Sequence, residues 1–195
     1  MKFLIKSFII FIILFYYSCI SNSNEHNVLE DDFEIKTDYG NHTKFIFTTG
    51  NILEGGNNKG DDFNHLSFDF SQTISSDTSY MIIVVAAAVN ILDIKKDTSL
   101  FILLDSSVLT FESIGGEAKL SYERNRLDDF IFPNSGFQYQ KELALYEIPK
   151  NLLSSISNAK NVKIKIYGSN SSREYYFGKN NFKNIKEFMK IISIK

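Results

Sequence analysis

The sequence predicts an α+β domain: a mainly antiparallel β-sheet, sandwich-like or a partly open barrel, with a C-terminal helix packed on it. Three observations predict this class. Short runs that alternate apolar and polar residues recur from residue 33 onward, as in half-buried strands. Residues 80–89 are apolar on both faces, as in a central strand. Apolar residues in 182–192 follow helical spacing. The chain has 195 residues, 44% of them apolar, which suits a single domain over residues 33–195.

The predicted strands share β-branched or alternating apolar residues bounded by turn residues: 44–49, 65–70, 80–89, 100–104, 108–111, 118–122, 139–148, 161–168 and 173–177. A long connection rich in Gly and Asn, residues 50–64, separates the first two. Gly115 and Gly116 lie between strands 108–111 and 118–122, so we expect these two strands to pair as a hairpin.

Two helices are expected in the C-terminal third. Pro149 suits the first position of one, because Leu152, Leu153 and Ile156 follow it at helical spacing. Asn181 is the predicted cap of the last helix. The apolar face of that helix is predicted to consist of Phe182, Ile185, Met189 and Ile192.

Residues 1–18 are predicted to be a secretory signal peptide. Lys2 and Lys6 precede an uncharged apolar core over residues 7–17, and the small residue Ser18 follows it. A transmembrane anchor is the alternative. Even residues 7–20 would form a helix of only about 21 Å, against a hydrocarbon core of roughly 30 Å.

Cys19 is the only cysteine of the sequence and stands directly after this core. Residues 16–19, Tyr-Tyr-Ser-Cys, resemble a lipobox, the motif that ends at the lipidated cysteine of bacterial lipoproteins. Ser18 and Cys19 fit the motif, whereas Tyr16 and Tyr17 depart from it in the way spirochaete lipoproteins do. The resemblance implies acyl chains on Cys19 and a place in the bacterial cell envelope, at the outer membrane rather than the inner one. Cleavage and secretion without lipid are the alternative.

Residues 19–32 are predicted to be the lipidated N-terminus and a flexible tether, because they are polar and lack periodicity. Cleavage before Cys19 removes two of the 21 basic residues and none of the 23 acidic ones, which takes the formal net charge from −2 to −4. This charge offers no electrostatic basis for binding nucleic acid. The expected partners are a membrane, reached through lipid on Cys19, and an unidentified protein or small-molecule ligand.

The sequence predicts no catalytic residues, no metal site and no cofactor. Asp61 and Asp62, followed by His65, are the best candidate for a cation site, but a turn explains them more simply. Asp128 and Asp129 are adjacent, so on a strand they would point to opposite faces. The sequence has no Gly-x-Ser-x-Gly motif to place a nucleophile.

The predicted interaction surface consists of Arg173, Tyr175, Asp61 and Asp62. Arg173 and Tyr175 share one side of a strand, and an exposed Arg–Tyr pair is typical of protein interfaces. Burial under the final helix explains the pair equally well. Together these observations favour a non-catalytic binding or interaction module. The alternatives are a periplasmic structural or assembly factor and, less favoured, an envelope hydrolase.

Overall fold

The computed structural model describes residues 33–40, 42–55, 65–88, 92–94, 96–123, 137–169 and 171–193. The chain divides into two compact units, Met1–Asp31 and Asp32–Lys195, and every described residue belongs to the second. The predicted signal peptide, Cys19, the tether, and Asp61 and Asp62 lie outside the described residues. No helix within the described ranges has the length and apolar character needed to cross a membrane.

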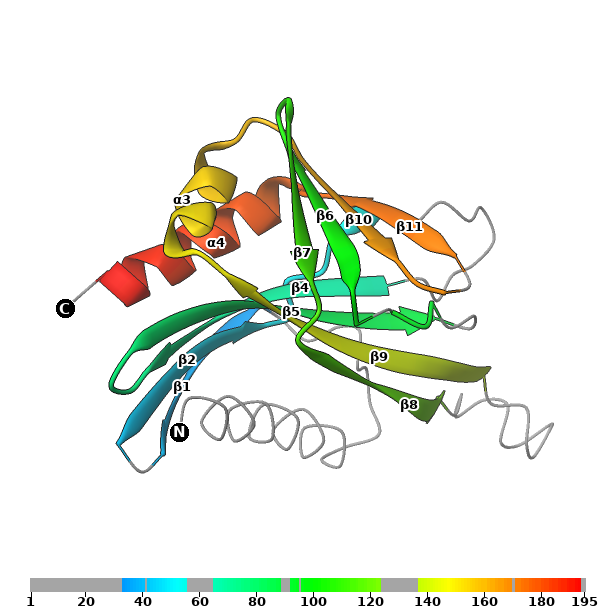
Figure 1. Ribbon diagram of the computed structural model, residues 1–195, viewed down its shortest axis with the longest axis horizontal. Coiled ribbons are helices and arrows are strands. Elements are labelled where there is room, and N and C mark those ends of the chain that lie inside the picture. The colour runs from blue at the N-terminus through cyan, green and yellow to red at the C-terminus, as the bar shows by residue number, and fades with distance from the viewer. Residues whose placement is uncertain are drawn as a thin grey trace. The chain divides into compact units, whose positions relative to one another are not determined.

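Two antiparallel sheets make up most of the second unit (Figure 1). Sheet A has six strands in the order β1-β2-β4-β5-β9-β8: Glu34–Gly40, Thr43–Thr49, His65–Ile74, Thr78–Ala88, Phe137–Ile148 and Gly115–Glu123. Sheet B has five in the order β3-β11-β10-β6-β7: Glu54–Gly55, Ser172–Tyr176, Val162–Tyr167, Thr98–Leu104 and Ser107–Glu112. The helices are α3, Lys150–Asn158, and α4, Lys179–Ser193. The predicted α+β class, mainly antiparallel and sandwich-like with a docked C-terminal helix, is confirmed.

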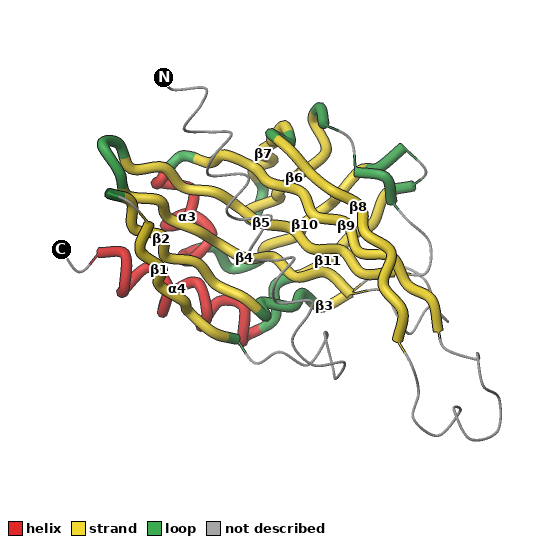
Figure 2. The backbone as a smooth tube through the Cα atoms, turned by 90° about the horizontal axis from the view of Figure 1, so that it is seen from below, coloured by secondary structure: helices red, strands yellow, loops and turns green. Residues whose placement is uncertain are grey.

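One hydrophobic core joins both sheets and both helices. Its fully buried side chains include Phe68, Phe70, Ile82 and Tyr146 from sheet A, Ile102 and Ile164 from sheet B, and Ile156 and Phe188 from the helices. Figures 1 and 2 show the helices and sheet B on the same side of sheet A. The predicted central strand, residues 80–89, corresponds to β5, which pairs with β4 on one edge and β9 on the other.

Both predicted helices form, with small differences at their first residues. Pro149 is the cap of α3, one position before the helix, and its carbonyl accepts the Leu152 N–H at 3.0 Å. Helix α4 begins at Lys179, so the prediction that Asn181 precedes the helix as its cap is wrong. Asn181 instead lies in the first turn, where its Oδ1 accepts the Gly178 N–H at 2.8 Å, which is the reciprocal half of a capping box.

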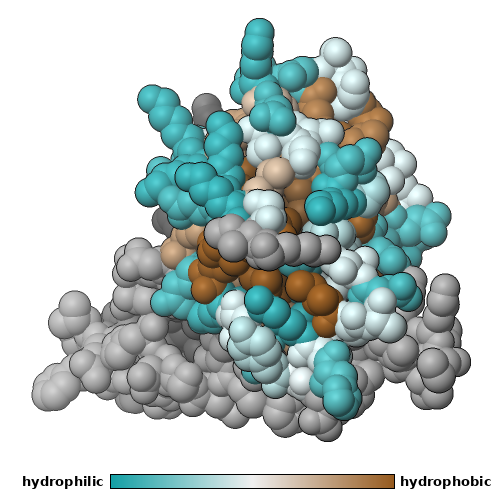
Figure 3. All heavy atoms as spheres, turned by 90° about the vertical axis from the view of Figure 1, so that its left-hand side faces the viewer, coloured by the Kyte–Doolittle hydropathy of each residue, from teal (hydrophilic) through white to brown (hydrophobic). Residues whose placement is uncertain are grey.

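The exposed residues of α4 are mostly polar: Lys183, Lys186 and Lys190 are exposed, although Ile191 is exposed too. Ile185, Phe188 and Ile192 are buried, and Phe182 and Met189 pack at the margin of the core. Figure 3 shows the side of the molecule that faces left in Figure 1, where hydrophilic side chains surround a band of apolar ones.

The predicted hairpin around Gly115 and Gly116 is wrong. Strand β7 pairs with β6 across the turn Asp105–Ser106, whereas β8 pairs with β9 in the other sheet. Gly115 is already extended and lies opposite Leu145. A glycine pair signals a local turn only when the flanking strands have no better partner elsewhere, and here each strand has one. Strands β10 and β11, by contrast, are neighbours in sequence that do pair as an antiparallel hairpin.

Candidate functional site

Arg173 and Tyr175 are buried, with exposed fractions of 5% and 0%, so the prediction of an exposed Arg–Tyr pair is wrong. Their side of β11 faces the core beside the buried Ile166 and Ile164, their register partners on β10. Burial raises the pKa of Tyr175, and the nearby Arg173 guanidinium opposes that rise. The pair therefore belongs to the interior of the fold.

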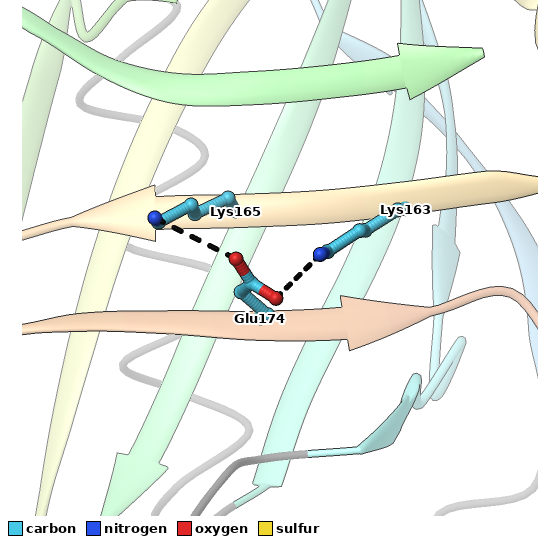
Figure 4. A network of polar contacts seen from close by, with 3 residues as sticks. All are labelled: Lys163, Lys165 and Glu174. Atoms are coloured by element: carbon cyan, nitrogen blue, oxygen red, sulfur yellow. Dashed lines mark ion pairs between the residues drawn. The ribbon is translucent and has the colours of Figure 1, made fainter. Parts of the chain in front are cut away.

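The opposite side of β11 carries an ion-pair network (Figure 4). The Glu174 carboxylate lies 2.5 Å from Lys163 Nζ and 3.5 Å from Lys165 Nζ. The hydrogen bond from Lys163 lowers the pKa of Glu174 and raises that of Lys163. Lys163 also lies over the Tyr176 ring, and Lys165 over the Tyr167 ring. Because both ammonium groups already have a carboxylate and a ring as partners, the network accounts for them as sheet-surface contacts.

Asp69, on β4, is a buried carboxylate with three hydrogen-bond donors. Ser67 Oγ and Thr48 Oγ1 donate to it, the latter at 2.9 Å, and the Asn51 N–H donates at 3.2 Å. Burial raises the pKa of Asp69 to about 6, although these donors oppose the rise. Thr48 Oγ1 in turn accepts the Phe70 N–H. Asp69 therefore ties the chain after β2 to β4.

The segment around Asn51 is also joined to the first turns of α4. There Asn51 contacts Asn181 and Asn184, and we call these contacts the closed junction. Asn51 Oδ1 accepts from Asn181 Nδ2 at 2.9 Å and from Asn184 Nδ2 at 3.0 Å. Asn51 Nδ2 donates to the Phe68 carbonyl, and its side chain has no exposed surface. The first part of the connection predicted over residues 50–64 is thus firmly packed, while residues 56–64 lie outside the described ranges.

Helix α3 and strand β7 of sheet B border a groove of about 620 Å³, which we call the β7–α3 groove. Half of its lining residues are apolar: Leu104, Leu109, Phe111, Pro149, Leu152 and Ala159. The lining also has hydroxyl and amide side chains: Ser107, Thr110, Asn151, Ser155 and Asn158. Ligand sites combine apolar side chains, which supply contact area, with polar groups that orient the ligand, and this groove has both.

Asp105 is the charged member of the groove lining. It lies at the turn between β6 and β7 with φ at 52°, a conformation that Asp adopts more readily than most residues. Its Oδ1 accepts the backbone N–H groups of Lys160 and Asn161 at 3.0 and 2.9 Å. These bonds fix the β6–β7 turn against the chain that follows α3 and so hold the two walls of the groove in position.

The groove was not predicted, because its two walls are formed by segments about forty residues apart. The available signal was the composition of residues 107–112, Ser-Val-Leu-Thr-Phe-Glu, in which Pro and Lys are absent. Because strand 108–111 was predicted to pair with strand 118–122 as a hairpin, its open edge was not recognised. Among the described side chains, no cluster of three or more His, Cys, Asp or Glu is placed to hold a metal ion.

Comparison with known proteins finds no relative of this chain. No protein-family model, no curated protein and no solved structure matches the chain.

Proposed function

We propose that this protein is a non-catalytic binding module of the bacterial cell envelope, anchored to a membrane by lipid on Cys19, and that the β7–α3 groove holds its ligand. The groove carries the proposal. It is open at the surface, about 620 Å³ in volume, and lined by both apolar and polar side chains from a sheet and a helix. A volume of this size suits a drug-sized molecule or a few residues of a polypeptide.

The chemistry of the lining favours binding over reaction. Its polar side chains are mainly hydroxyl and amide groups, which orient a ligand through hydrogen bonds. Its carboxylate, on Asp105, already accepts two backbone N–H groups. A group engaged in this way serves to hold the turn.

The anchor rests on the sequence. A basic region, a short apolar core and a cysteine directly after it are the pattern of a lipoprotein precursor. One acyl chain binds a membrane only marginally, whereas two or more hold firmly. Labelling with a fatty-acid analogue should mark the wild-type protein and leave Cys19→Ala unlabelled and in the soluble fraction. Equal label in both proteins would contradict the anchor.

The groove is tested separately on intact cells with a photocrosslinking residue in place of Asn158. We expect an adduct that disappears when Ser155→Trp fills the groove. Lys186→Trp, on the exposed side of α4, is the matched control and should leave the adduct unchanged. An adduct that persists in Ser155→Trp would show that the ligand lies elsewhere.

A further inference from the structure

We infer that the ligand of the β7–α3 groove is an extended polypeptide segment that adds to sheet B as a new strand beside β7. This inference rests on the proposed function, because it names the class of ligand for the same groove. Three observations on the described part of the chain support it: the outward backbone groups of β7 have no strand partner there, that edge carries none of the usual protective features, and the groove lies along it.

Strand β7 is the terminal strand of sheet B. Its register with β6 begins at the closing pair Leu104–Ser107, on either side of a two-residue turn. In such a hairpin the closing pair exchanges both backbone hydrogen bonds, and so does every second pair beyond it, here Ile102–Leu109. Val108 and Thr110 therefore direct their N–H and C=O groups away from β6, toward the open edge.

The other terminal strands carry the features that discourage strand addition, and β7 does not. Strand β3 has two residues, which is too short to serve as a template. Strand β1 carries Glu34, Lys36 and Asp38, and β8 carries charged residues along its length. In β7 the charge is confined to Glu112 at its end, and Val108 is 61% exposed. An exposed, nearly uncharged edge of six residues is a template for pairing.

The groove lies where the side chains of an added strand would point. Successive side chains of a strand alternate between two faces, so every second residue of the segment would enter the groove over Leu109, Phe111 and Leu152. Six residues of β7 span about 20 Å, enough for a segment of about six residues. Asp105 gives one end of the groove a negative charge, which favours a segment with Lys or Arg at that end.

The experiment uses the full chain in detergent micelles and acetylated, amidated six-residue peptides that alternate Val and Thr, with Lys at one end or the other. We expect a dissociation constant below about 1 mM for one of the two orientations. N-methylation of the alternate residues that face β7 should weaken binding at least about tenfold. Methylation of the other alternate residues is the matched control, because their N–H groups point away from the sheet.

Amide hydrogen exchange provides an internal comparison within the protein. The bound peptide should slow exchange at Val108 and Thr110 and leave Leu109, already paired with Ile102, unchanged. Thr110→Pro removes one outward N–H and should abolish binding, whereas Thr110→Val keeps it. If Thr110→Pro lowers the melting temperature, the peptide methylation series on the wild-type protein decides the question without a mutation.

The outcomes separate the two proposals. If Ser155→Trp abolishes peptide binding but Thr110→Pro keeps it, strand addition is overturned and the groove remains the site. The same conclusion follows if both methylation patterns weaken binding equally. Binding unaffected by either variant overturns both proposals. A concentration-dependent dimer that Thr110→Pro dissolves overturns the inference too, because a second copy would then occupy the edge. So does failure of every peptide to bind wild type at about 1 mM.

Discussion

At the closed junction and at the β7–α3 groove, a helix faces the sheets, but the polar groups are used differently. At the closed junction Asn51, Asn181 and Asn184 are almost fully buried and hydrogen-bonded to one another. Along the groove, Asn151, Ser155 and Asn158 are exposed, and the backbone of β7 has an open edge. Buried, mutually satisfied amides stabilise a fold, whereas exposed polar groups around an apolar hollow are available to a ligand. Substitutions at the first region should therefore change stability, and substitutions at the second should change binding.

The largest expected effect is at Phe188, where α4 packs on sheet A. Its ring stacks on Phe70 at 6.0 Å and has no exposed surface. Phe188→Asp should lower the free energy of unfolding by at least about 4 kcal/mol, from lost packing and a buried charge. Ile191→Asp, on the 39% exposed side of the same helix, should cost less than about 1 kcal/mol. Urea denaturation measures both, and equal losses would mean that α4 does not dock as described.

The next effect is a pH dependence that originates at Asp69. Its pKa in the folded protein is about 6, above the ordinary value of 3.8. The folded state therefore holds this proton more tightly than the unfolded chain does. The resulting stability is present below about pH 4 and is lost as the pH rises to about 6, a change of about 3 kcal/mol.

Asp69→Asn keeps the acceptor for Thr48 and Asn51 and removes the titration. Its unfolding free energy, followed by urea denaturation between pH 4 and pH 7, should lack the component that the wild type loses over this range. Parallel curves for the two proteins would assign the pH dependence to other groups.

A third prediction compares the stability effect of one asparagine at the closed junction with that of one at the β7–α3 groove. Asn51→Ala removes an acceptor from two buried amides and should lower the free energy of unfolding by about 2 kcal/mol. Asn151→Ala, at the exposed rim of the groove, should change it by less than about 0.5 kcal/mol. Thermal unfolding of both variants tests this, and a large loss in Asn151→Ala would indicate that the groove is a structural part of the fold.

The smallest effect on stability is expected for the substitution that fills the groove. Ser155 is exposed on α3, and its hydroxyl bonds only the Asn151 carbonyl of its own helix among the hydrogen bonds described. Ser155→Trp should shift the free energy of unfolding by less than about 0.5 kcal/mol while it blocks ligand binding. A variant that unfolds readily would contradict the view that this space is free.

Local pattern was enough to predict what depends on neighbouring residues. The alternation of Val162, Ile164 and Ile166 identified β10 and its inward face, and the continuous apolar run of 80–89 identified β5. Which side of β11 faces inward was not decided locally, because both of its faces carry a tyrosine beside a charged residue. The core includes the side of Tyr175 because the partner residues Ile164 and Ile166 lie there.

The candidate site depends on pairing between distant residues, and the sequence alone did not predict it. Strands β7 and β8 are neighbours in sequence but belong to different sheets, a choice that depends on β6 and β9. The buried Asn51–Asn181 bond spans 130 positions. Asparagines separated so far have no spacing signal, and a groove between a strand and a helix has none either.

The contrast between the closed junction and the groove is tested most directly by thiol labelling of the folded protein. In a Cys19→Ser background, which has no other cysteine, Leu109→Cys places a thiol in the groove and Ile185→Cys places one beneath α4. We expect Leu109→Cys to react with a small maleimide within about tenfold of the unfolded rate, and Ile185→Cys at least about a thousandfold more slowly, because it reacts only through opening. Equal rates at the two positions would contradict the account.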